Sequence, residues 1–201
     1  WRTAPSASAS PSPRDVNSHE RHGPHVSGTD RGWLLPADRR AVRTLGDPVL
    51  RTPAAVVTRF DAHLPGLARR MFAVMRSAGG VGLAANQIGV SLAVFVLDCA
   101  GITAAVVNPV LVVEDPVLVE AVEGCLSVPG HSYPTPRPRT VTVTGFDPDG
   151  APLRLHGTGL LARCLHHEVD HLTGRVYLDR LTGAVADRAR IETTSRPSAA
   201  R

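Results

Sequence analysis

The chain of 201 residues lacks lysine altogether, so its net charge of +4 rests on arginine. The arginines are scattered along the chain, which indicates a compositional bias more than a nucleic-acid surface. Aromatic residues make up only 4%, too few for a platform on which bases stack. No run of about 18 apolar residues occurs, which argues against a membrane-spanning helix. We therefore expect neither a nucleic-acid partner nor a membrane partner.

Cysteine is also scarce, with only Cys99, Cys125 and Cys164 in the whole chain. An odd count with no paired spacing argues against a disulfide framework and favours a reducing compartment. We therefore expect a cytoplasmic protein. Cys99 closes an apolar segment and is interpreted as a core or edge thiol.

Three regions differ in composition. Residues 1–36 are rich in Ser, Pro, Gly and Arg without a periodic apolar pattern, which predicts a disordered N-terminal extension. Residues 37–183 are long enough for one domain with its own core. Residues 184–201 are polar and are predicted to form a flexible C-terminal tail.

The folded region is predicted to be α+β, with small antiparallel or mixed sheets around a central helix. Apolar periodicity predicts a first helix over residues 61–78. The central helix is predicted to run from Thr158 or Gly159 to Gly174, a glycine placed to end it. Apolar and alternating runs predict strands at residues 92–98, 104–107, 109–114, 117–123, 140–145 and 152–156.

The central helix carries the most informative motif, because residues 166–171 read HHEVDH. Positions four apart share one helix face, so His167 and His171 can hold one metal ion while Glu168 stands beside it. A carboxylate in that place can handle the protons of a metal-bound water. The alternative is a pair of hydrogen-bonded core histidines.

A third metal ligand must come from elsewhere in the chain. Metzincin-type proteases continue the motif to a third histidine, but Tyr177 occupies that position here. Cys125 is a better candidate, because it follows an apolar run and Gly124 lets the backbone approach closely. One thiolate and two imidazoles leave a fourth position open, as in catalytic metal sites.

Another glycine-rich segment, GVGLAANQ at residues 80–87, lacks the ending of a phosphate loop. Together with EGCLSVPG at residues 123–130 and HHEVDH, it resembles the marker motifs of peptide deformylases. The resemblance extends to GDPVL at residues 46–50 and covers roughly residues 40–182. His166 departs from the pattern, because the family usually carries Gln there; we interpret it as tuning the surroundings of the site.

The resemblance implies removal of the formyl group from the N-terminal formyl-methionine of nascent proteins, with release of formate. One divalent metal ion per chain is implied, Fe²⁺ physiologically, with Zn²⁺, Ni²⁺ or Co²⁺ able to substitute. Cys125, His167 and His171 would bind this ion, and a metal-bound water would attack with Glu168 as general base and then acid. The Gln87 side chain and the Leu126 backbone N–H would stabilise the oxyanion.

The resemblance also implies an apolar pocket for the methionine side chain, and an ion pair of Glu123 with Arg137 that supports the Cys125 loop. The expected partners are nascent formyl-methionine peptides and transiently the ribosome, with the protein acting as a monomer. A zinc peptidase that cuts internal bonds and a non-catalytic peptide-binding relative remain as alternatives. The residues expected to bind substrate, with the peptide as an added strand beside the first three, are Gly80, Val81, Gly82, Leu160 and Cys164.

Overall fold

The structure is a computed structural model that describes residues 38–194. The predicted N-terminal extension, residues 1–36, and the last part of the predicted tail, residues 195–201, lie outside the described residues. Within residues 38–194, none of the helices combines the length and the apolar character needed to cross a membrane.

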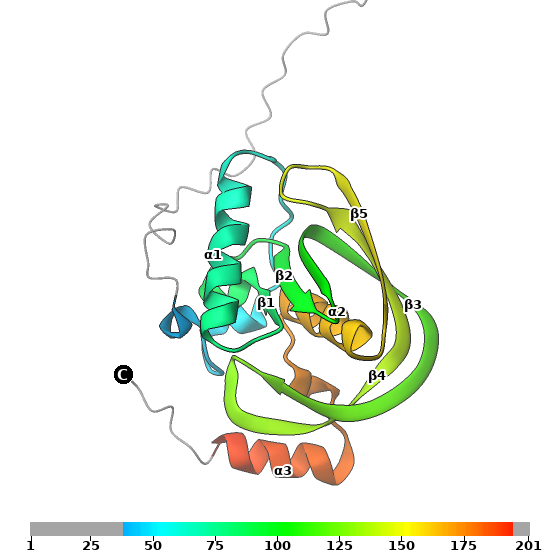
Figure 1. Cartoon of the computed structure of the whole chain (residues 1–201). Helices are drawn as coiled ribbons and strands as arrows, with labels where there is room; N and C mark the ends of the chain where they lie inside the picture. Colours follow the sequence, from blue (N-terminus) through cyan, green and yellow to red (C-terminus); the bar gives the residue numbers. More distant parts are fainter. Residues whose placement is uncertain (1–37, 195–201) are drawn as a thin grey trace, which may run out of the picture. The chain divides into compact units, whose positions relative to one another are not determined.

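Among residues 38–194, five antiparallel strands form one sheet in the order β1-β2-β3-β4-β5, so each strand pairs with its neighbours in the chain. With three α-helices, this confirms the predicted α+β class. In Figure 1, the long strands β3 and β4 curve around α2. The strands are β1 (Gly82–Ala84), β2 (Val94–Cys99), β3 (Ile102–Cys125), β4 (Val128–Phe146) and β5 (Pro152–Thr158).

The helices comprise three α-helices and four short 3-10 helices among the described residues. Helix α1 lies within the predicted range of residues 61–78, and α2 begins at the predicted Gly159. Gly174, two residues after α2, has a φ of +77°, as expected of a glycine that ends a helix. The bounds are α1 (His63–Ser77), α2 (Gly159–Leu172), α3 (Gly183–Thr194), η2 (Arg39–Ala41), η3 (Pro48–Arg51), η4 (Ala85–Ile88) and η5 (Tyr177–Arg180).

Strand β3 corrects the prediction of several short strands between residues 104 and 123. The pairing of β3 with β4 continues through this region, and the register shifts between Val107 and Val110 and between Asp115 and Leu118. Each shift contains a proline, which cannot donate to the ladder and is tolerated at a bulge. The breaks predicted at these prolines are therefore bulges within one long strand.

The β3–β4 hairpin brings Cys125 to its tip. Cys125 pairs with Val128, so only residues 126 and 127 connect the two strands. One apolar core lies between α1 and the first strands, and a second packs α2 against the sheet. The hairpin tip is thus part of the same sheet against which α2 packs.

Helix α3 covers residues 183–194, so the part of the predicted polar tail that the structure describes is helical. The Tyr133 hydroxyl on β4 donates a hydrogen bond to Glu192, at 2.5 Å. The Arg188 guanidinium lies 5.5 Å from the centre of the Tyr133 ring, and Ala189 is buried. Contacts distant in sequence thus hold a helix that has almost no apolar face of its own.

Candidate metal centre

Three possible metal ligands from the hairpin tip and helix α2 converge. The Cys125 Sγ and the His171 Nε2 are 3.2 Å apart, and the Nε2 atoms of His167 and His171 are also 3.2 Å apart. One ligand atom from each residue lies within 4.8 Å of the other two. The two histidines meet because they are one helical turn apart on α2. The structure thus brings together all three residues predicted as ligands.

The chemistry of these donors fits one divalent cation. The His167 Nδ1 lies 2.6 Å from a Glu123 oxygen. Burial alone would raise the pKa of Glu123, but hydrogen bonds from His167 and Arg137 outweigh it and lower this pKa to about 2. The ionised Glu123 therefore accepts the Nδ1–H of His167, which leaves Nε2 as the free donor atom. Burial lowers the pKa of His171 and favours its neutral, metal-binding form.

Glu168 stands beside the three ligands with one oxygen unsatisfied. Its side chain is buried, and Oε2 has no hydrogen-bond partner among the described residues. Burial raises the pKa of Glu168 to about 7. The other oxygen lies against Gly82 on β1, where an added Cβ would be only 2.3 Å from Oε1. The glycine therefore provides the space that this carboxylate occupies.

Gln87 on η4 faces the same hairpin. Its Oε1 accepts a hydrogen bond of 2.8 Å from the Ala84 N–H. Its Nε2 donates to the Ser127 hydroxyl at 3.1 Å and lies 3.6 Å from the Cys125 Sγ. Because the oxygen is held by the backbone, the NH₂ group of Gln87 is directed toward the ligands.

A cavity of about 610 Å³ opens beside the ligands. The glycine-rich segment, the β3–β4 hairpin and α2 all contribute to its wall. Every residue predicted to bind substrate lines this cavity. The lining includes Gly80, Val81, Gly82, Gln87, Glu123, Cys125, Leu126, Leu160, Arg163, Cys164, His167 and Glu168.

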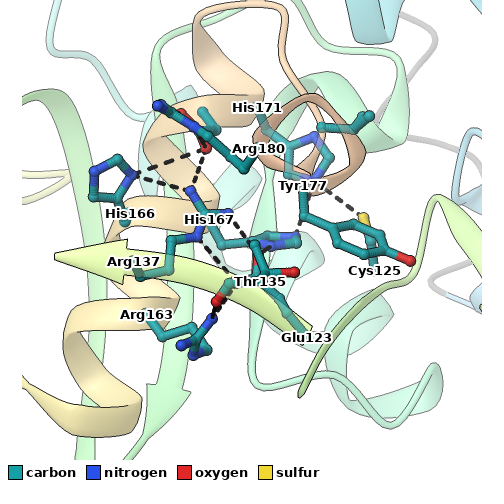
Figure 2. Close-up of polar contacts among 12 residues, drawn as sticks. Glu123, Cys125, Thr135, Arg137, Arg163, His166, His167, His171, Tyr177 and Arg180 are labelled. Atoms are coloured by element: carbon teal, nitrogen blue, oxygen red, sulfur yellow. Dashed lines mark hydrogen bonds and ion pairs between the residues drawn. The ribbon is translucent and has the colours of Figure 1, made fainter. Parts of the chain in front are cut away.

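A buried ion-pair network surrounds Glu123 and extends away from the ligands (Figure 2). The predicted Arg137 donates to both Glu123 oxygens, at 2.5 and 3.0 Å, and also pairs with Asp170. Asp170 in turn binds Arg180 of η5. His166 contacts Arg137 at 3.2 Å and is not among the three clustered ligands. Asp170 belongs to the HHEVDH motif, but no sequence pattern near Arg137 or Arg180 indicates that these arginines bind it.

Arg163 is a further member of this network that the sequence reasoning missed. It is buried on α2 and donates to Glu123 at 2.9 Å. A charged residue within the apolar stretch of a buried helix was the available signal, since such a residue requires a partner.

Tyr177, which occupies the third-ligand position of metzincins, does not join the ligand cluster. Its hydroxyl donates to the His131 backbone carbonyl at 3.0 Å. Its ring lies 6.3 Å from the centre of the His167 ring and nearly parallel to it. Tyr177 therefore packs against a candidate ligand, and the third residue of the cluster is Cys125.

Comparison with known proteins agrees with this geometry. The family model of polypeptide deformylases matches residues 39–186. The chain is 49% identical to peptide deformylase 2 of Streptomyces avermitilis over 168 residues, which cover 81% of this chain and 87% of the relative. It is 50% identical to peptide deformylase of Acidothermus cellulolyticus over 142 residues, which cover 71% and 78% of the two chains.

Solved structures give the same likeness. A peptide deformylase from Synechococcus elongatus in complex with actinonin has a TM-score of 0.72 at 36% identity, covering 78% of this chain and 88% of that chain. A peptide deformylase from Legionella pneumophila has a TM-score of 0.70 at 40% identity, covering 78% and 98%. The likeness thus extends from the motifs to the arrangement of the whole described domain.

Proposed function

This chain belongs to the polypeptide deformylase family, and from that premise we propose which of its residues carry the reaction. Members remove the N-formyl group of nascent peptides, and this chain is such an enzyme. Water adds to the formyl carbonyl, the C–N bond breaks, and formate and a free N-terminal amine leave. The observation that carries the proposal is the convergence of Cys125, His167 and His171 beside the buried Glu168.

Cys125, His167 and His171 would hold the metal ion. A bound divalent cation supplies Lewis acidity, which lowers the pKa of water and polarises a carbonyl oxygen. One thiolate and two imidazoles accept several divalent ions, so Zn²⁺, Ni²⁺ or Co²⁺ can replace the Fe²⁺ that we propose as the physiological ion. The chain's own task is to present three unprotonated donor atoms and to leave room for the substrate.

Glu168 would act as general base and then as general acid. Glu168 lines the cavity and keeps one oxygen, Oε2, without a hydrogen-bond partner, so a carboxylate oxygen can accept a proton from the attacking water. The same oxygen can later deliver that proton to the departing amine nitrogen. Gly82 allows this placement because it has no side chain to displace the carboxylate.

Gln87 and Leu126 would stabilise the negative charge that develops on the formyl oxygen. Both residues line the cavity beside Cys125. The Gln87 amide oxygen is held by the Ala84 N–H, which fixes the side toward which Nε2 points. The Leu126 backbone N–H is a second donor without a full charge, which suits an oxyanion site.

The peptide would enter along residues 80–82 and place its methionine side chain against Leu160 and Cys164. Strand β1 contains part of this segment and lies at the end of the strand order, so its outer edge can pair with an extended peptide. Val81 is half exposed at this edge. These features support a linear peptide as the substrate.

We also propose a monomer that acts in the cytoplasm, in transient contact with the ribosome. All residues of the proposed site come from one chain, which supports a monomer. Cys99, Cys125 and Cys164 are free thiols, which suits a reducing compartment. The nascent chain as substrate supports the ribosomal contact.

A two-substrate assay tests the proposed function. Purified protein loaded with one divalent ion is incubated with a formyl-Met peptide and, separately, with an acetylated peptide of the same sequence. Formate and peptide fragments are measured independently. The proposal expects formate from the first peptide and no internal fragments from either one. Internal cleavage without formate would support the zinc peptidase alternative.

A further inference from the structure

Arg163 connects helix α2 to both long strands beside the metal centre. Its side chain is buried, and Figure 2 places its guanidinium next to Glu123 and Thr135. It donates to Glu123 Oε2 at 2.9 Å, to the Thr135 carbonyl at 2.8 Å and to the Val119 carbonyl at 2.9 Å. Three acceptors on two strands therefore fix one guanidinium.

Arg163 completes the hydrogen bonding of the Glu123 carboxylate. Glu123 Oε1 accepts from His167 and Arg137, and Oε2 accepts from Arg137 and Arg163. A carboxylate has about four lone-pair sites, and these four bonds occupy them. Without Arg163, Oε2 would keep a single donor, and the carboxylate could rotate away from its present plane.

The orientation of Glu123 matters because this residue holds a proposed metal ligand. The bond between Glu123 and the His167 Nδ1 sets which nitrogen of the ring carries the proton and which way Nε2 points. Groups that orient a metal-binding histidine in this way typically change metal affinity or activity by about 10- to 100-fold when they are lost.

We propose that Arg163 is a positioning residue for the metal centre. It holds Glu123 in the plane that directs His167 Nε2 toward the metal, although it touches neither ligand atoms nor reacting atoms. Arg137 also binds Glu123 and is linked to α2 through Asp170, whereas Arg163 is itself a residue of α2, the helix that carries both histidines. The inference rests on the proposed ligand set.

The test compares metal release among matched variants. The parent, Arg163→Met and Arg163→Lys are loaded with Co²⁺, and transfer of the ion to a chelator is followed with the Co²⁺ absorption spectrum. Release should be about 10-fold faster or more in Arg163→Met, with a shifted spectrum, and intermediate in Arg163→Lys. Lysine keeps the charge but cannot supply the planar fork.

Two control variants distinguish the proposed positioning role of Arg163 from other roles that it could have. Arg154→Met removes an exposed arginine paired with Glu114 at 3.6 Å, and should release Co²⁺ like the parent. Leu160→Ala alters the cavity wall without touching Glu123, and should change KM without changing release. A purely structural role for Arg163 would lower the melting temperature of the metal-free protein and leave the Co²⁺ spectrum unchanged.

If both Arg163 variants release Co²⁺ at the rate of the parent and show its Co²⁺ spectrum, the inference is overturned. This holds even if KM changes in those variants. If Arg163→Met does not fold, Arg163→Lys decides alone, and its parent-like release is the contradicting result. A parent protein that holds no Co²⁺ would instead refute the proposed ligand set, so the two failures are distinguishable.

Discussion

Replacing Gly82 by alanine adds a single methyl group at the place where β1 meets Glu168. The new Cβ would lie 2.3 Å from Glu168 Oε1, 2.8 Å from its carboxyl carbon and 3.0 Å from the Cys164 sulfur. Contacts this short do not persist, so the carboxylate must retreat by about 1 Å to reach an ordinary separation. Gly82 has no positive φ, so the conflict is steric and not conformational.

A displacement of about 1 Å at a reacting group can reduce the rate by about 10²-fold. We therefore expect kcat for formate release by Gly82→Ala to fall by about this factor. Overpacking should reduce the free energy of unfolding by about 1 to 2 kcal/mol, a small part of the stability of a domain. The metal content should stay at one ion per chain, because Glu168 is not a proposed ligand.

The assay measures formate release with a formyl-Met peptide, together with bound metal and thermal unfolding. Gly66→Ala is the matched control: it lies on α1, and the nearest atom to its added Cβ is 3.9 Å away. This variant should keep full activity and unfold at an equal or higher temperature. Parent-like kcat in a metal-loaded Gly82→Ala protein would refute the assignment of this space to a catalytic carboxylate.

Three further predictions concern other parts of the structure. Gln87→Leu should lower kcat by about 10²-fold with little change in KM, and an unchanged steady-state kcat would remove Gln87 from the oxyanion site. Cys125→Ser should retain metal poorly in dialysis at neutral pH because a hydroxyl is a weak ligand; parent-like metal content would disprove the thiolate ligand. Truncation after Thr182 removes α3 and its contacts with Tyr133, so denaturant unfolding should show a loss of about 2 kcal/mol. Unchanged stability would mean that α3 does not dock in solution.

The sequence predicted the candidate site well because its chemistry imposes local spacing. Two histidines on one helix can share a metal ion when they are one helical turn apart, which points to His167 and His171 without knowledge of the fold. Cys125 was recognisable from its neighbouring glycine and from the motif around it. The paired Glu123 and Arg137 came from the resemblance alone, and the structure brings them within hydrogen-bonding distance.

Features that depend on distant contacts could not be predicted from the sequence. The apolar runs predict separate strands at residues 104–107, 109–114 and 117–123, but β4 continues alongside them, and the gaps between them are register shifts within β3. Helix α3 has weak apolar periodicity, and its docking depends on Tyr133, about fifty residues away in the chain. The role of Gly82 depends on which side chain packs against it, and no sequence pattern indicates that this side chain is Glu168.

The most direct test of the proposed mechanism is formate release by Glu168→Ala at a measured metal content. We expect this variant to bind one divalent ion per chain like the parent, since Glu168 is not among the three clustered ligands. Its rate of formate release should fall by at least about 10²-fold, because the variant loses the carboxylate proposed to transfer the proton. Near-normal formate release, or loss of the metal ion, would contradict the account.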